Sequence, residues 1–301
     1  MFFIPLFDEN ATSRRPVIVW LIITTCIFAF FWQQSLDGIA ARLTIYQFGF
    51  VPAIVFQDET LPAQFIIVPS WATFITSMFL HGGWLHLGGN MLYLWIFGDN
   101  VEDSMGRGRF IVFYLLCGAF AALAQGLIEP SSQVPMVGAS GGIAGVLGAY
   151  LMLHPKAAVR CLFIVIVFFR FINLPAWLVL GGWIGLQFAA APESFSGNGG
   201  GVAYIAHIGG FLAGLALIPF FKKSLPENLD TLILMGADVL HEEMLYSIDQ
   251  FMMNGGSLIV MVDPFTRVKP ANNAINPSPS VSINDISDLL DRYGASYQGE
   301  S

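Results

Sequence analysis

Long apolar stretches alternate with short charged segments over about the first 222 residues of the chain. An apolar stretch of about 20 residues is long enough to cross the hydrocarbon core of a bilayer as a helix. Six stretches are candidate membrane spans: 16–33, 82–98, 109–128, 140–154, 173–191 and 203–221. The fourth is short, which suits a helix that begins below the membrane surface. The pattern therefore predicts an all-α polytopic membrane protein with six transmembrane helices.

The run between the fourth and fifth spans does not fit this pattern. Residues 161–192 are too long for one span and too short for two, and they contain Arg170 and Pro175. We expect 161–172 to be an interfacial or re-entrant piece, with the fifth span starting near Leu174. Outside the spans, we expect a short polar lead at the N-terminus and a first loop that lies along the membrane surface, which are residues 1–15 and 34–80 respectively.

Basic residues indicate which side of the membrane each loop faces. They cluster before span 1, between spans 2 and 3, between spans 4 and 5, and after span 6, whereas the alternate loops hold only Arg42. The positive-inside rule then predicts that both termini are cytoplasmic. Only 11% of the residues are charged, against roughly a quarter in a soluble domain. We expect an integral protein of a prokaryotic inner membrane, in contact with the lipid bilayer and without nucleic-acid partners.

The fourth span opens with the sequence GASGG, which holds Ser140 in an otherwise apolar run. Polar groups inside a membrane are costly and point to function. Gly138 and Gly141 flank the serine and give a backbone that can turn sharply and expose the hydroxyl and the Ser140 amide. Ala144 and Gly148 follow at helical spacing, forming a face that another helix can approach closely.

The sixth span offers a matching face, with His207, Gly210 and Gly214 on one stripe. Two stripes of small residues would let the helices touch backbone to backbone. A histidine nitrogen could then come within hydrogen-bond reach of the serine oxygen, as an activated nucleophile requires. The alternative for His207 is a buried structural histidine.

The second span carries His86 and Asn90, which are four residues apart and therefore share one helical face. Hydrogen-bond donors of this kind can hold the oxyanion of a tetrahedral intermediate. The alternative is hydrogen bonding between helices. His81 lies in the preceding loop, and we expect it to be structural. The three cysteines show neither disulfide nor metal-ligand spacing, so we expect no metal and no organic cofactor.

The motifs GASGG around Ser140, HLGGN at 86–90 and AHIGG at 206–210 resemble the three signatures of the rhomboid intramembrane serine proteases. The resemblance covers about residues 1–222. It implies a six-helix rhomboid core that cuts transmembrane protein substrates near the outer membrane face. It also implies that Ser140 is the nucleophile and His207 the general base, with His86, Asn90 and the Ser140 amide as the oxyanion hole.

Two features depart from some rhomboids. An aromatic residue four positions after the serine, which stacks on the histidine in those proteins, is Ala144 here. An adjacent Trp-Arg pair in the first loop is missing. Because spans 4 to 6 contain no Asp or Glu, we expect a Ser-His dyad whose imidazole is oriented by packing on the glycine stripes. The alternative function is a catalytically inactive relative that binds or escorts membrane proteins, although such proteins usually lose the serine or the histidine.

Residues 223–301 form a mostly polar tail. Two apolar strands at 229–236 and 257–265 flank a helix at 241–256, which predicts a βαβ unit with parallel strands. A Pro/Asn/Ser linker at 266–282 precedes a terminal helix that ends before Gly294. Residues 229–293 resemble part of the gliding-type auxiliary domain of ABC transporters. We therefore predict a small cytoplasmic α/β tail, which is truncated, fused or dependent on a cytoplasmic partner because its core is small.

Overall fold

The fold is known from a computed structural model of the chain. It describes the following residues: 2–10, 12–57, 62, 66–165, 168–195, 202–222, 231–235, 242–253 and 255–261. The chain divides into two units, Met1–Lys223 and Ser224–Ser301. Each unit is described by itself.

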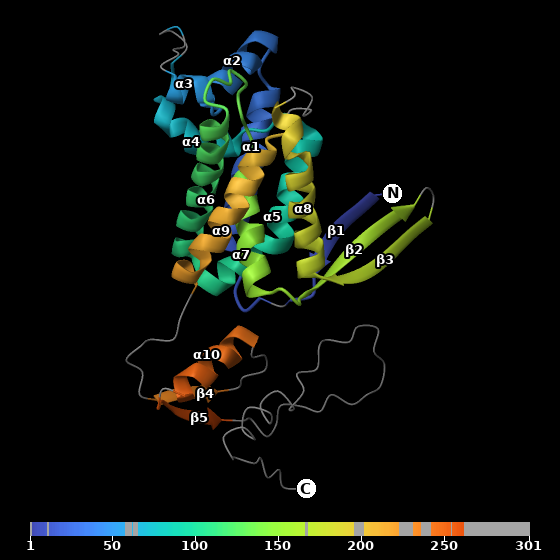
Figure 1. Cartoon of the computed structure of the whole chain (residues 1–301), viewed down its shortest axis with the longest axis vertical. Coiled ribbons are helices and arrows are strands. Elements are labelled where there is room, and N and C mark those ends of the chain that lie inside the picture. The colour runs from blue at the N-terminus through green and yellow to red at the C-terminus, as the bar shows by residue number, and fades with distance from the viewer. Residues whose placement is uncertain are drawn as a thin grey trace. The chain divides into compact units, whose positions relative to one another are not determined.

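The first unit is mainly a bundle of helices that run side by side (Figure 1). Each of the six predicted spans carries a helix: α1 (Val17–Gln34), α5 (Trp84–Met105), α6 (Arg107–Ile128), α7 (Ser140–Leu153), α8 (Ala176–Phe195) and α9 (Tyr204–Phe221). Among the described residues, α1, α6 and α9 are long and apolar enough to cross a membrane. Whether all six helices span the bilayer stays a prediction.

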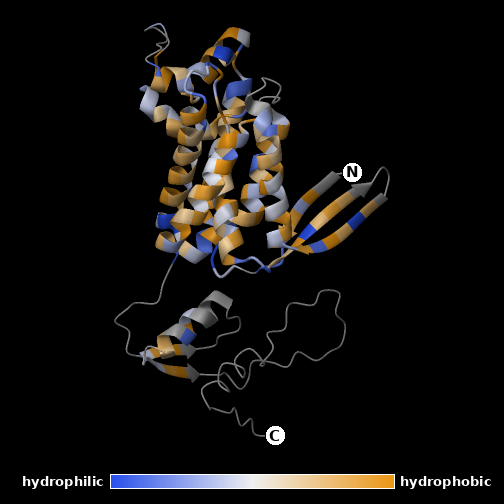
Figure 2. Ribbon diagram, viewed as in Figure 1, coloured by the Kyte–Doolittle hydropathy of each residue, from blue (hydrophilic) through white to orange (hydrophobic). Residues whose placement is uncertain are grey.

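Apolar residues predominate along the helices of the bundle, as the hydropathy colours show (Figure 2), and many of them are exposed. Phe28 is 70% exposed on α1 and Phe220 is 81% exposed on α9. A soluble protein rarely exposes large contiguous apolar surface. These outward faces are suited to contact with lipid tails.

Short helices occupy the connection between α1 and α5. They are α2 (Gly38–Phe48), α3 (Pro52–Phe56), α4 (Thr73–Thr76) and the 3₁₀ turns η2 (Ser70–Ala72) and η3 (Ser77–Phe79). Asp37 caps α2, since its carboxylate accepts a hydrogen bond from the Ala40 amide at 3.2 Å. Trp71 exposes 73% of its surface in this region. The location of this connection along the membrane surface stays a prediction.

Three β-strands form in this unit, in two segments for which the sequence analysis did not predict strands. β1 (Phe2–Asp8), β2 (Ala158–Val165) and β3 (Phe168–Pro175) form an antiparallel sheet in that order. Residues 2–8 of the expected polar lead thus form a strand, and residues 161–165 and 168–172 of the expected interfacial or re-entrant piece lie in two paired strands. Whether this piece contacts the membrane stays a prediction. Aromatic and β-branched residues favour strands, but a strand also needs a partner. The partner of β1 lies about 150 residues away, where local periodicity gives no signal.

The Arg160 guanidinium stabilises this sheet across its strands. It lies 5.6 Å from the ring centroid of Phe7 on β1 and 5.6 Å from that of Phe171 on β3. Cation–π contacts of this kind contribute about 0.5–1 kcal/mol each at exposed sites. The arginine therefore ties both outer strands to the central strand that carries it.

Glycines set the close approach of α7 and α9. We call Gly141, Gly145 and Gly148 of α7, together with Gly210 and Gly214 of α9, the glycine seam. A methyl group on Gly210 would collide with the Gly141 carbonyl oxygen, and one on Gly214 would collide with that of Gly145. The α7 side of the seam therefore runs through Gly145. Ala144 is fully buried but lies one position away from it.

A hydrogen-bonded network ties residues 8–19 to the C-terminal end of α5. Buried Glu102 accepts from the backbone amides of Ile18 at 3.2 Å and Val19 at 2.9 Å. This carboxylate caps α1 from a neighbouring helix, since Pro16 at the N-cap position provides no side-chain cap. Asp8 accepts from the Tyr150 hydroxyl of α7 at 2.5 Å and from the Asn100 amide at 2.8 Å.

In the second unit, strands β4 (Thr231–Met235) and β5 (Ser257–Met261) pair in parallel and are connected through α10 (Glu242–Met253). Parallel neighbours require a crossover of this kind. Ile248 of α10 is fully buried. The predicted linker at 266–282 and the terminal helix lie outside the described residues.

The glycine seam yields the first prediction. Gly214→Ala should lower the unfolding temperature of the detergent-solubilised protein, because overpacking a well-packed contact typically costs about 1–3 kcal/mol. Gly182→Ala on α8 is the matched control, since a methyl group there meets nothing within 4 Å. Removing a helical glycine in open space should stabilise slightly. Equal unfolding temperatures for the two variants would contradict the seam.

The second prediction concerns Asp8. Burial raises the pKa of its carboxyl from 3.8 to about 7, and the nearby Asp99 carboxylate adds to the rise. The folded state therefore holds this proton more tightly than the unfolded state. The stability that Asp8 contributes is complete below about pH 4 and is lost as the pH rises through about 7. Unfolding temperatures of the native protein minus those of Asp8→Asn, measured from pH 4 to 8, should fall with pH. A constant difference would refute the assignment.

Candidate active site

Ser140 is the first residue of α7, directly after a sharp turn. The turn depends on Gly138, whose φ of +132° lies where side chains are rarely tolerated. A Cβ atom at residue 138 would also lie 2.8 Å from the His86 ring atoms Cε1 and Nε2. Glycine is thus required both for the turn and for the close approach of His86 to the backbone beside the serine.

The glycine seam brings Ser140 and His207 together although they are 67 residues apart. Ser140 Oγ lies 2.8 Å from His207 Nε2, at hydrogen-bond distance. Both side chains are half-buried. A hydroxyl that donates to an imidazole nitrogen can lose its proton to that nitrogen as the oxygen attacks an electrophile.

Donors from α5 face the same turn. His86 Nδ1 accepts from the Gly82 amide at 3.3 Å, which leaves the other ring nitrogen, Nε2, toward Gly138. Asn90 is 8% exposed, and its amide nitrogen is buried without a hydrogen-bond partner among the described residues. A buried N–H donor without a partner is costly. Such donors can bind an oxygen that becomes negatively charged during a reaction.

His81 has a different environment. Its backbone amide donates to the Gln33 side chain at 3.0 Å, and its carbonyl accepts from the same side chain at 3.3 Å. Burial lowers the pKa of the His81 imidazole to about 4, with a further contribution from His86. The ring is therefore neutral at pH 7. Both ring nitrogens of His81 are buried without a hydrogen-bond partner among the described residues, and the ring lies 5.3 Å from that of His86 between centroids. The structural role of His81 stays a prediction.

Two residues of α8 contact His207 that the sequence interpretation missed. Gln187 Oε1 lies 2.8 Å from His207 Nδ1, and the indole ring of Trp183 lies 5.7 Å from the imidazole between centroids. We had expected the imidazole to be oriented by packing on the glycine stripes. Gln187 and Trp183 also restrict the orientation of the ring. Gln187 is polar within an apolar span, so the rule that singles out Ser140 and Asn90 could have found it.

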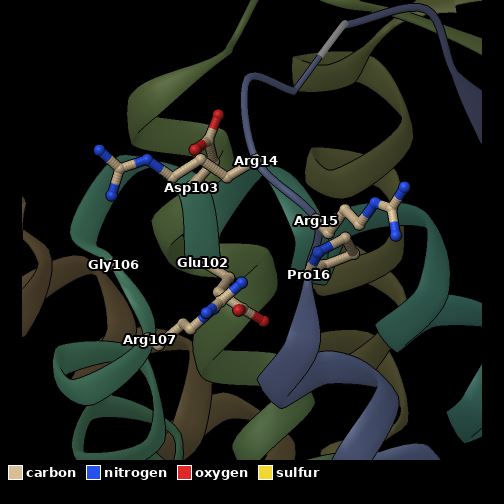
Figure 3. Close-up of a pocket in the computed structure, with 7 residues that line it drawn as sticks. All are labelled: Arg14, Arg15, Pro16, Glu102, Asp103, Gly106 and Arg107. Carbon is tan, nitrogen blue, oxygen red and sulfur yellow. The ribbon is translucent and has the colours of Figure 1, made fainter.

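One pocket lies elsewhere in this unit, where α1, α5 and α6 meet (Figure 3). It has a volume of about 440 Å³ and is lined by Arg14, Arg15, Pro16, Glu102, Asp103, Gly106 and Arg107. Its two carboxylates bind the backbone of α1 and residue Ser13. None of the residues proposed for the active site lines it. Among the described residues, no group of three His, Cys, Asp or Glu side chains is placed to hold a metal ion.

Comparison with known proteins shows the family of the chain. Residues 68–224 match the family model described as Rhomboid domain, and residues 216–300 match one described as ABC-type uncharacterized transport system. The rhomboid protease GluP of Bacillus subtilis (strain 168) is 32% identical over 208 residues, which cover 68% of this chain and 36% of GluP. The chain belongs to the rhomboid family.

Two further relatives are more distant. Rhomboid-like protein 11, chloroplastic, of Arabidopsis thaliana is 29% identical over 54% of this chain and 56% of its own length. The rhomboid protease GlpG of Salmonella newport (strain SL254) is 25% identical over 70% of this chain and 65% of its own length. The chain thus spans between about a third and two thirds of these relatives. It is an integral membrane protein with apolar membrane helices, and the resemblances seen in the sequence of both its parts are confirmed.

Proposed function

We propose that this protein is an intramembrane serine endopeptidase that hydrolyses transmembrane protein substrates with a Ser140–His207 dyad. The observation that carries the proposal is the 2.8 Å distance between Ser140 Oγ and His207 Nε2. An inactive, client-binding relative is less well supported, because such a protein does not need this pair in hydrogen-bond contact. Membership of a family in which GluP and GlpG are named proteases adds to the support.

In the first chemical step, Ser140 Oγ attacks the scissile carbonyl carbon while its proton moves to His207 Nε2. The resulting tetrahedral oxyanion would accept hydrogen bonds from Asn90 Nδ2, His86 Nε2 and the Ser140 amide. The Ser140 amide is available because the first N–H groups of a helix have no partner within the helix. The positive end of the α7 dipole also favours negative charge at this point.

Collapse of the intermediate breaks the peptide C–N bond, and His207 returns its proton to the leaving amine. The acyl group then remains on Ser140. A water molecule attacks this ester while His207 removes one of its protons, and the second collapse releases the new carboxyl terminus and restores the Ser140 hydroxyl. Histidine thus acts as base and acid in turn.

The membrane orientation follows from charge. Ser140 opens α7, whereas Lys156 and Arg160 follow its other end. Arg107 and Lys222 lie at the corresponding ends of α6 and α9. By the positive-inside rule these ends are cytoplasmic and the dyad lies toward the outer face. We propose six spans, cytoplasmic termini and a prokaryotic inner membrane, with residues 1–222 as the protease domain and 223–301 as a separate cytoplasmic domain.

The third prediction tests the dyad. Ser140→Ala and His207→Ala should each abolish cleavage of a model transmembrane substrate in detergent, because each removes one of the two reacting groups. A serine-directed fluorophosphonate should label the native protein and leave Ser140→Ala unlabelled. Glu129→Gln is the control, since no carboxylate enters the mechanism. A loss of cleavage in folded Glu129→Gln equal to that of His207→Ala would refute the dyad.

The fourth prediction tests the oxyanion donors. Asn90→Ala should lower kcat by up to about 10²–10³-fold and leave measurable activity, because other donors remain. The matched control is Asn173→Ala, which removes an exposed amide of β3 that donates a hydrogen bond to Glu9. Cleavage by Asn173→Ala should match that of the native protein. If kcat of folded Asn90→Ala were also unchanged, Asn90 would not be an oxyanion donor.

A further inference from the structure

The side chain of Gln187 links α8 to the imidazole of His207. The two ring nitrogens of His207 have different partners: Nε2 lies 2.8 Å from Ser140 Oγ, and Nδ1 lies 2.8 Å from Gln187 Oε1. The imidazole is therefore held at both nitrogens, by the nucleophile on one side and by a neutral amide on the other.

A second contact decides which end of the amide faces the histidine. Gln187 Nε2 donates to the backbone carbonyl of Trp183 at 3.3 Å, one helical turn earlier. A carbonyl can only accept hydrogen bonds, so the NH₂ group must face it. The opposite orientation would place two oxygens against each other. The amide oxygen therefore faces His207.

The orientation of the amide fixes the tautomer of the neutral histidine. Because Gln187 Oε1 can only accept, His207 Nδ1 must carry the proton. His207 Nε2 then presents its lone pair to the Ser140 hydroxyl, which is the form that a general base requires. The opposite tautomer would lose the bond to Gln187 and direct an N–H group at the serine.

Trp183 restricts the same ring from its face. Its indole lies 5.7 Å from the imidazole between centroids, at an interplanar angle of 36°, and it also contacts the ring of Phe211 at 6.4 Å. The small Ala144 leaves the imidazole without an aromatic neighbour from α7. Trp183 supplies an aromatic neighbour from α8, and its carbonyl holds Gln187.

We propose that Gln187 is a positioning residue for the general base, which selects the Nδ1–H tautomer of His207 and directs Nε2 at Ser140. This inference rests on the proposed function. A carboxylate could hold the same proton, but a charge inside the membrane is costly. The amide orients the ring without that cost and without the full negative charge by which the acid of a triad stabilises the imidazolium.

Substitution of Gln187 tests the role in catalysis. Gln187→Ala should lower kcat about 10- to 100-fold with little change in KM, because the base is less often in its reactive form. Gln187→Glu retains an acceptor for the Nδ1 proton and should recover most of the rate. Its carboxylate also favours the imidazolium, so the acidic limb of its pH–rate profile should move about one unit to higher pH. A purely structural role would not move that limb.

Leu186→Ala is the matched control, because it lies on the same helix with 68% of its surface exposed. It should retain the native kcat. If Gln187→Ala also kept the native kcat, or if the Glu variant showed the same loss as the Ala variant and no shift in pH, the positioning role would be overturned. If the native protein neither cut substrate nor reacted with a fluorophosphonate, the proposed function itself would fail.

A direct measurement does not depend on whether the Gln187 variants fold. In the ¹⁵N spectrum of protein labelled at histidine, with the His207 signals assigned by their absence in His207→Ala, Nδ1 should be protonated and Nε2 unprotonated at pH 8. Protonation at Nε2 would refute the proposal.

Discussion

The backbone contact between α7 and α9 is the constraint on which the candidate site depends. Gly210 and Gly214 lie against the carbonyl oxygens of Gly141 and Gly145, where even a methyl group would collide. Association of helices within lipid relies on close packing because burial of apolar surface gives little gain there. The same close approach sets the distance between Ser140 and His207. Stability of the bundle and geometry of the proposed dyad are thus consequences of one packing arrangement.

Polar groups within the bundle are arranged so that most have a defined partner. The Gln187 amide uses both its ends, and the Glu102 carboxylate accepts from the start of α1. Among the described residues, His81, Asn90, Tyr114 and Gln125 each have a buried polar side-chain atom without a partner, and that of Asn90 faces the turn before Ser140. A buried N–H donor without a partner destabilises the fold. A place beside the nucleophile gives it a partner during the reaction, namely the oxygen that then becomes negatively charged.

The ends of the helices opposite Ser140 are held by other means. Arg160 links three strands through two aromatic rings, and Asp8 connects β1 to α5 and α7 through hydrogen bonds. The Asp8 carboxyl is titratable, whereas the glycine seam contains no titratable side chain. The two ends of the bundle should therefore respond differently to pH.

The positions of the bundle helices could be predicted from the amino-acid sequence, because apolar runs of membrane length and their charged boundaries are local signals. The sequence also singled out Ser140, His207, His86 and Asn90, since polar residues are conspicuous in such runs. Three contacts became visible only in the folded chain: β1 pairs with β2, Gly145 belongs to the seam, and Gln187 contacts His207. Each of these depends on the rotation of one element against another distant in the chain, which the periodicity of a single segment does not specify.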